Sequence, residues 1–275
     1  MAFEQRDSAS QRRIFDQYVM ERRARSIDGY DVDLLPFASR YVPRSKGSEP
    51  FLNFTNLPIG DERRLIREQI AFFEKRGESF EWKTYDLDCP SNLRQLLELE
   101  GFVADPYEAF MVFPLDRDLH SQRADLRQFT IREAAWNDHV IDDIVKIQES
   151  VWARDFSWLN SQLRDGLRAH VDQLSVYCVY HGGIPVGSGW IDFPPNSRFA
   201  DLHGGAVVEE LRGQGIYSLL FQRRAQEARR RSYSYLTVDA APMSRPLLER
   251  AGFDYVCGTY PMKMSFQAQR KSNAI

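Results

Sequence analysis

Residues 207–220 read Val207-Val-Glu-Glu-Leu-Arg212-Gly-Gln-Gly215-Ile-Tyr217-Ser-Leu-Leu220, a strand end followed by a turn with two glycines and a helix start. Glycines let the backbone turn tightly and approach a ligand closely. The unpaired N–H groups of a first helical turn attract anions. We therefore expect this segment to form a cradle for a pyrophosphate; the alternative is that Gly213 and Gly215 only shape a turn.

Two other phosphate-binding motifs are excluded by the same residues. No Gly-Lys-Ser/Thr follows the turn, so the segment is not a P-loop, and the G-x-G-x-x-G spacing of dinucleotide sites is absent.

The composition points to a globular protein that acts on small ligands. The 275 residues are 43% hydrophobic and 27% charged, and at ~150 residues per domain the length suits two domains. The net charge of -3 gives no positive field for nucleic acid. Three separated cysteines, the charged residues near the N-terminus and the lack of a long apolar run favour a cytoplasmic protein without disulfides, metal or membrane segment.

Hydrophobic periodicity divides the chain into two series of elements. The first series is predicted to have helices at 10–26, 61–76 and 91–100 and strands at 51–57, 80–87 and 107–113, with a turn-rich stretch at 27–49. The second is predicted to have helices at 137–153, 159–173, 215–231 and 244–250 and strands at 129–133, 175–180, 185–193, 199–208, 235–239 and 255–266. Asn137 or Asp138 is expected to cap the first helix of the second series.

An internal repeat connects the two series. Residues 80–86 (Phe-Glu-Trp-Lys-Thr-Tyr-Asp) match 233–239 (Tyr-Ser-Tyr-Leu-Thr-Val-Asp), and the Gly-Phe at 101–102 matches the Gly-Phe at 252–253. The same order of strand, helix, Gly-Phe and strand in both places indicates a duplication.

The glycine turn resembles the acetyl-CoA-binding motif of the GNAT acetyltransferase superfamily, Q/R-x-x-G-x-G/A, with residues 212–217 in its six positions. Tyr217 departs from the small final residue. The stretches at 184–187 and 242–253 also look like that family, so the resemblance spans about 128–266. It implies an α+β GNAT fold, in which helices flank a mixed, mostly antiparallel central sheet, partially duplicated in this chain.

The resemblance also suggests domain boundaries. We expect a degenerate, partial GNAT-like domain at 1–115, a linker at 116–127, a complete domain at 128–268 and a tail at 269–275. Residues 56–62 (Asn-Leu-Pro-Ile-Gly-Asp-Glu) stand where the first copy should have its cradle and contain no Arg-x-x-Gly. The alternative for the first domain is an unrelated α/β cap.

The activity that the resemblance implies is transfer of an acetyl group from acetyl-CoA to a primary amine by direct attack in a ternary complex. The acceptor would be a small-molecule amine or a peptide, and the chain a monomer or homodimer. The implied cofactor-binding residues are Val207, Val208, Arg212, Gly213, Gln214, Gly215, Ile216, Tyr217, Ser218 and Ser244.

Asp201 and His203 are the candidates for the general base. An amine with a pKa near ~10.4 must lose a proton before it attacks, and the family often places its base on the strand at 199–208. Alternation puts both side chains on one face, with Gly205 and Val207 further along it. The alternatives are a solvated hairpin aspartate and a half-buried structural histidine.

The family's usual proton donor to the thiolate is missing. Its tyrosine would fall on Leu248 and its frequent asparagine on Ala241. Ser244, Tyr217 or Tyr260 could substitute, or water could supply the proton. This departure supports two rival hypotheses, a CoA-binding sensor or scaffold without catalysis and an O-acyl or longer-chain acyltransferase.

Aromatic and basic residues add weaker candidates. Trp152, Phe156 and Trp158 could receive a partly apolar acceptor, and core packing is expected for at least one of them. The arginines at 223, 224 and 229–231 could meet CoA phosphates, but a solvated helix face is the favoured interpretation.

Overall fold

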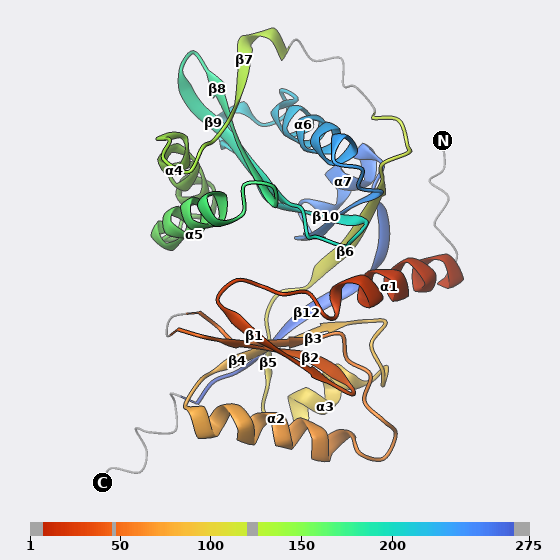
Figure 1. Ribbon diagram of the computed structural model, residues 1–275. Helices are drawn as coiled ribbons and strands as arrows, with labels where there is room; N and C mark the ends of the chain where they lie inside the picture. The colour runs from red at the N-terminus through yellow and green to blue at the C-terminus, as the bar shows by residue number, and fades with distance from the viewer. Residues whose placement is uncertain (1–7, 46–47, 120–125, 267–275) are drawn as a thin grey trace. The chain divides into compact units, whose positions relative to one another are not determined.

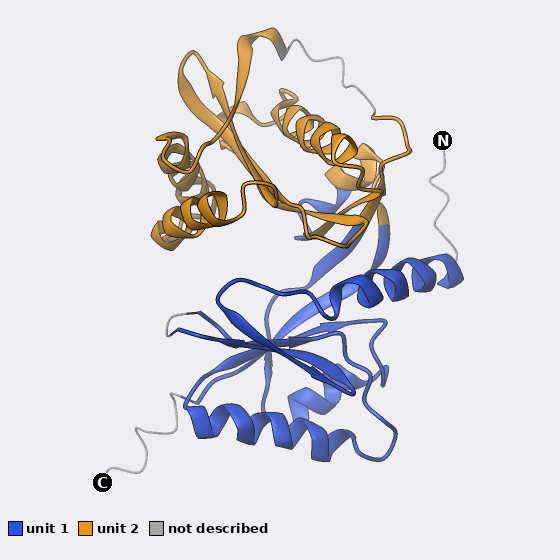
Figure 2. Ribbon diagram, viewed as in Figure 1, with its two compact units in different colours: residues 1–111, 239–246, 255–275 blue, residues 112–238, 247–254 orange. Residues whose placement is uncertain are grey.

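The computed structural model describes residues 8–45, 48–119 and 126–266, which form two compact units (Figure 2). Unit 1 contains residues 1–111, 239–246 and 255–275, and unit 2 contains residues 112–238 and 247–254. The chain thus passes from unit 1 to unit 2 and returns twice to unit 1.

The sheet of unit 2 has the strand order β11-β10-β9-β8-β7. Its neighbours are antiparallel except for β10 and β11, which run parallel. The strands are β7 (Phe129–Glu133), β8 (Leu174–His181), β9 (Ile184–Asp192), β10 (Phe199–Val207) and β11 (Tyr235–Ala240).

Helices cover both faces of this sheet, with α4 (Val140–Trp152) and α5 (Ser157–Ala169) on one side and α6 (Ile216–Arg230) on the other (Figure 1). Alternation along β9 explains the two faces. A Cβ atom added at Gly187 would meet Ile216 of α6, whereas the neighbouring Ser188 accepts a hydrogen bond from Gln148 of α4. The absence of a side chain at Gly187 therefore lets α6 approach the sheet closely.

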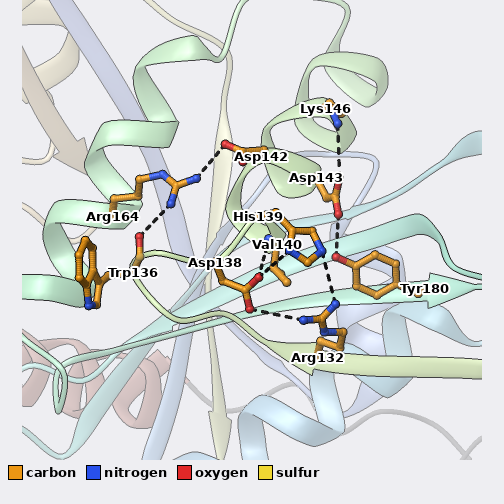
Figure 3. Close-up of polar contacts among 10 residues, drawn as sticks. All are labelled: Arg132, Trp136, Asp138, His139, Val140, Asp142, Asp143, Lys146, Arg164 and Tyr180. Atoms are coloured by element: carbon orange, nitrogen blue, oxygen red, sulfur yellow. Dashed lines mark hydrogen bonds and ion pairs between the residues drawn. The ribbon is translucent and has the colours of Figure 1, made fainter.

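The beginning of α4 is held by side chains on both sides of it (Figure 3). The N-cap of α4 is His139 and not the predicted Asn137 or Asp138, although Asp138 accepts a hydrogen bond from the backbone N–H of Val140 at 3.3 Å. Tyr180 of β8 donates to Asp143 at 2.8 Å, and Arg164 of α5 pairs with Asp142 at 2.9 Å. These contacts fix α4 against β8 and α5.

The sheet of unit 1 has the strand order β1-β2-β3-β4-β12, with β5 paired to β12. Only β3 and β4 are parallel among these pairs. The strands are β1 (Tyr30–Leu35), β2 (Ala38–Pro43), β3 (Phe51–Asn53), β4 (Phe80–Tyr85), β5 (Val103–Ala104) and β12 (Asp254–Met264), and β6 (Glu108–Pro114) leads from unit 1 into unit 2.

Unit 1 buries its core between this sheet and the helices α2 (Glu62–Arg76) and α3 (Leu93–Leu99). Phe73, Trp82 and Leu97 are fully buried in it. The remaining helix, α1 (Ser8–Arg22), packs Phe15 against the ring of Tyr85, with ring centroids 5.1 Å apart. The helix α7 (Arg245–Ala251) and two short 3-10 turns, η1 (Leu126–Gln128) and η2 (Glu209–Leu211), complete the elements.

The hairpin of β1 and β2 lies in residues 27–49, which the sequence analysis reads only as turn-rich. Leu35 pairs with Ala38 across a two-residue turn. Residues of β1 are at least partly exposed along the whole strand, so the strand lacks the alternation of buried and polar positions that would have revealed it.

The repeat predicted from the sequence has the same local structure in both copies. Gly101 and Gly252 both have positive φ angles, 97° and 99°, directly after α3 and α7. In each copy the N–H of the following phenylalanine donates to the carbonyl of a buried leucine, Phe102 to Leu97 and Phe253 to Leu248. These bonds close the helix ends in the same way.

Some predictions fall partly outside the described residues. These are the charged N-terminal residues, the whole tail at 269–275 and residues 120–125 of the linker. The domain boundaries stay a prediction. Within the described ranges, no helix has the length and apolar character needed to cross a bilayer.

Candidate functional site

The parallel strands β10 and β11 separate partway along their length. Three pairs join them, and the last is Asp201 with Thr237. Beyond this pair β10 continues to Val207. The backbone of β10 after Asp201 therefore has an edge that β11 does not pair.

The glycine turn follows directly after this open edge. Gly213 and Gly215 have φ angles of 78° and 86°, in the region that favours glycine. Gly215 is the N-cap of α6, so the first N–H groups of that helix point into the turn without intrahelical acceptors. A Cβ atom at Gly213 would meet nothing within 4 Å. The turn thus has the conformation and the open space that an anion cradle requires.

Arg212 and the two valines shape the turn. The Nε of Arg212 donates to the carbonyl of Val207 at 3.3 Å, and the N–H of Val208 donates to the carbonyl of Val186 at 3.0 Å. Both contacts fix the end of β10. The other predicted cradle residues, Gln214, Ile216 and Ser218, lie in the turn and the first turn of α6.

Tyr217, which departs from the family motif, points toward the sheet. A Cβ atom at Gly205 would lie 2.9 Å from the Tyr217 ring, so this ring packs on the backbone of β10. Burial raises the pKa of Tyr217, and the neighbouring guanidinium of Arg224 opposes that shift. The bulk of the tyrosine is therefore accommodated by a glycine on the strand.

A bulge interrupts β10 between His203 and Ala206. Gly204 has a φ angle of 58°, and side chains from both faces hold the bulge. Arg224 of α6, 1% exposed, donates to the carbonyl of His203 at 3.3 Å. Gln148 of α4, 2% exposed, donates to the carbonyl of Gly204 at 2.7 Å. Two carbonyl groups at the bulge are thus satisfied by buried side chains.

The bulge corrects one expectation about this strand. Asp201 and His203 do share a face, because they pair with Asp192 and Trp190 on β9. Gly205 and Val207 were expected on the same face, but they lie on the opposite one, toward α6. One extra residue at the bulge reverses the alternation.

The two candidate bases have different surroundings. Asp201 is 7% exposed and accepts a hydrogen bond from the hydroxyl of Thr237. The His203 side chain is 46% exposed, and its Nε2 lies 3.5 Å from Asp192 Oδ2. The imidazole also stacks on Trp190 at 6.4 Å between ring centroids. His203 is thus the more accessible of the two.

The candidates Ser244 and Tyr260 belong to unit 1. Ser244 lies just before α7, where its N–H donates to the carbonyl of Ala241. Tyr260 borders a small pocket of unit 1, and the guanidinium carbon of Arg94 lies 4.3 Å from the centre of its ring. The roles of both residues stay predictions.

The weaker candidates separate clearly by burial. Phe156 is a core residue, 6% exposed, whereas Trp152 and Trp158 are 43% and 56% exposed. The arginines of α6 do not form one solvated face, because Arg224 is buried. The other four arginines also have partners within the protein. Arg229 donates to the carbonyl of Leu115, Arg230 and Arg231 donate to the carboxylate of Glu227, and Arg223 donates to the carboxylate of Glu133.

Gln148 and Thr237 are site residues that sequence reasoning missed. Both are polar residues within otherwise apolar positions of a helix and a strand, and their partners lie far away in the chain. No local signal identifies them, but a buried polar residue requires a partner. Among residues 8–45, 48–119 and 126–266, no cluster of histidine, cysteine and carboxylate side chains could hold a metal ion.

Comparison with known proteins gives the family of this region. Residues 131–253 match the model of the acetyltransferase (GNAT) family. A search of the curated proteins finds no match.

Solved structures with the same fold cover nearly the whole chain. A GCN5-related N-acetyltransferase from Kribbella flavida has a TM-score of 0.65 at 10% identity and covers 97% of this chain and 98% of its own. A conserved protein of unknown function from Staphylococcus epidermidis has a TM-score of 0.63 at 17% identity, with 87% and 95% covered.

A tandem GNAT protein from the clavulanic acid biosynthesis pathway bears on the repeat. It has a TM-score of 0.59 at 12% identity and covers 87% of this chain and 84% of its own. This similarity supports the partial duplication, and the α+β fold with a mixed sheet between helices is confirmed. The cradle, the separated strands and the family match together identify residues 131–253 as a domain of the GNAT acetyltransferase family.

Proposed function

We propose that this protein is an acetyl-CoA-dependent N-acetyltransferase that acetylates a primary amine in a ternary complex. The observation that carries the proposal is the end of the β10–β11 pairing at Asp201 and Thr237, just ahead of the glycine turn at the start of α6. A long, narrow thioester ligand with a pyrophosphate at one end suits an open strand edge that leads to an anion cradle.

Acetyl-CoA fits the residues present. The backbone N–H groups from Gly213 to Ser218 would hold the pyrophosphate. The positive φ angles of Gly213 and Gly215 give the turn the conformation that this requires. Arg212 would support pyrophosphate binding indirectly, because its hydrogen bond to the carbonyl of Val207 holds the turn in place. Acetyl-CoA supplies the activated acetyl group when it is bound.

The reaction needs two proton movements. The amine nitrogen attacks the carbonyl carbon of the thioester, a C–N bond forms, and the C–S bond breaks with the electron pair leaving on sulfur. The ammonium form of the amine must first lose its proton, and the thiolate must gain one. A base within hydrogen-bond reach, or one water away, is sufficient for the first step.

His203 is the better candidate for that base. It is accessible, and Asp192 lies at ion-pair distance from its Nε2, which favours the protonated imidazole that forms when it accepts a proton. Asp201 shares the face but is buried and accepts the Thr237 hydroxyl. We assign Asp201 a positioning role at the point where the strands separate.

The proton for the thiolate comes from Ser244, Tyr217, Tyr260 or water in this proposal. Tyr217 carries its phenolic proton at neutral pH, because the ordinary pKa of a tyrosine is about 10, so it can donate; burial raises this pKa and makes Tyr217 a weaker acid. The acceptor is a small-molecule amine or a peptide, and neither nucleic acid nor membrane takes part.

Release of free CoA from acetyl-CoA in the presence of a panel of amines tests the proposal. Amine-dependent release, with the acetylated amine identified by mass spectrometry, is the expected result. Tight CoA binding without release for any amine would support the sensor or scaffold instead. Faster release from longer acyl-CoA thioesters or with alcohol acceptors would support the rival acyltransferase.

A further inference from the structure

One face of unit 2 carries a connected strip of aromatic and acidic side chains. Asp192 and Trp190 lie on β9, and His203 lies opposite Trp190 on β10. All three are on the face that α4 and α5 cover, because Trp190 packs against the core cluster of those helices. Trp190 is partly buried, and Trp152, at the end of α4, adds a second indole that is exposed.

Trp190 is fixed in place by the bulge of β10. A Cβ atom at Gly204 would lie 1.7 Å from the Trp190 ring, so the indole lies directly on the glycine backbone. The imidazole of His203 lies beside the indole, with ring centroids 6.4 Å apart and 26° between the ring planes. The ring is held before any ligand arrives, which lowers the cost of binding.

Gln148 connects the second indole to the same bulge. Its amide nitrogen donates to Gly204 O at 2.7 Å and to Ser188 Oγ at 2.9 Å, and its amide oxygen accepts from Trp152 Nε1 at 3.1 Å. The hydrogen-bonding groups of this buried amide are thus engaged. Both indoles are positioned by contacts to one backbone turn.

The negative charge of Asp192 and the indole faces together favour a positively charged ligand. Asp192 supplies a carboxylate with 32% of its side chain exposed, and indole faces attract cations. A protonated amine next to a flat or apolar group satisfies both features. A highly hydroxylated amine would have to bring some of its hydroxyl groups out of water next to the indoles without hydrogen-bond partners, which costs free energy.

We propose that the strip of Trp152, Trp190, His203 and Asp192 recognises the acceptor, and that the acceptor is a small protonated amine carried on a flat or apolar group. This inference rests on the proposed function and narrows its acceptor class. Asp192 attracts the ammonium group, the indoles contact the apolar group, and His203 lies between them where a proton is to be removed.

The test compares acceptors and variants in the full chain. The acceptors are 2-phenylethylamine, butylamine and glucosamine, and kcat and KM are measured for each at saturating acetyl-CoA. The variants are Asp192→Asn and Trp152→Leu. Matched controls are Asp165→Asn and Trp136→Leu, which change an exposed carboxylate on α5 and an exposed indole outside the strip.

We expect 2-phenylethylamine to have the highest kcat/KM and glucosamine the lowest. Each strip variant should raise KM for 2-phenylethylamine roughly 3- to 30-fold, and the controls should change KM less than twofold. Trp152→Leu should change kcat less than KM, whereas Asp192→Asn should also lower kcat because Asp192 pairs with His203. Equal kcat/KM for the three amines, or equal KM effects of strip and control variants, would overturn the inference while leaving the proposed function standing.

A binding measurement separates the two claims if no amine is acetylated. Calorimetric titration of the chain with 2-phenylethylamine, butylamine and glucosamine needs no turnover. Selective binding of 2-phenylethylamine that Asp192→Asn weakens would support the strip and count against acetyl transfer. Failure of all three amines to bind or react would overturn the inference.

Discussion

Gly215 is the residue on which the proposed binding of acetyl-CoA depends most. Gly215→Asp should place a Cβ atom and a carboxylate at the N-cap of α6, where phosphate oxygens belong. A φ angle of 86° adds strain for any side chain. We expect the affinity for CoA to fall at least 100-fold in titration calorimetry.

Gly182→Asp is the matched control for this substitution. Gly182 also has a positive φ angle, 57°, and open space around its Cβ position, but it lies in the hairpin between β8 and β9. The Gly182→Asp substitution should leave the affinity for CoA within a few-fold of the wild-type value. Unchanged CoA affinity in a folded Gly215→Asp protein would contradict the cradle assignment.

His203 and Asp201 are distinguished by the pH dependence of turnover. Loss of the base should lower kcat roughly 10²-fold at neutral pH. The rate should recover as the pH approaches the pKa of the amine itself, because the unprotonated amine then needs no base. We expect this behaviour from His203→Gln, with CoA affinity within a few-fold of the wild type.

Asp201→Asn should have a smaller effect, because an amide oxygen can still accept the hydroxyl of Thr237. The same pH–rate profile in both variants as in the wild type would exclude both residues. The base would then be Glu209, Glu210 or a water held by the backbone.

The bulge of β10 is the element whose loss should be most costly. Gly204→Ala would drive a Cβ atom into the ring of Trp190, 1.7 Å away, so the strand or the indole must move. The free energy of unfolding should fall by roughly 2–4 kcal/mol, measured by denaturant titration.

Gly183→Ala separates backbone strain from this steric conflict. Gly183 has a φ angle of 82° and nothing within 4 Å of its Cβ position, so only strain of about 1 kcal/mol is expected. Equal destabilisation by the two substitutions would show that the Trp190 contact does not hold the bulge.

The elements differ in how well the sequence predicts them. The α6 turn is predictable because residues 212–217 are a local pattern whose glycines are needed for its conformation. The bulge is not, because Gly204 is required by a tryptophan on another strand. The β1–β2 hairpin is missed since β1 is exposed along its length, and the partners of Gln148 are distant in the chain.

At the scale of the whole molecule, the strand β12 joins distant parts of the sequence. Met262 pairs with Trp82 of β4, and both are fully buried. A fragment of residues 128–275 would keep β12 but lose β4, exposing an unpaired strand and apolar core. We expect this fragment to aggregate, as seen by light scattering, at concentrations where the full chain does not. A monodisperse fragment would show that the first 127 residues are dispensable for folding.

Only one of the two copies should bind CoA. In unit 1 the turn before α2 carries Asp61 and Glu62, and the Glu62 carboxylate accepts a hydrogen bond from the N–H of Gly60 at 2.9 Å. Two carboxylates at this helix start disfavour a phosphate. The second turn, at Gly215, has no such competitor in its own sequence.

Calorimetric titration of the full chain with acetyl-CoA tests the account most directly. The predicted result is one molecule bound per chain, with all of the binding lost in Gly215→Asp and retained in Gly182→Asp. A stoichiometry of two, or full binding in a folded Gly215→Asp protein, would contradict the central claim that the turn before α6 holds the cofactor.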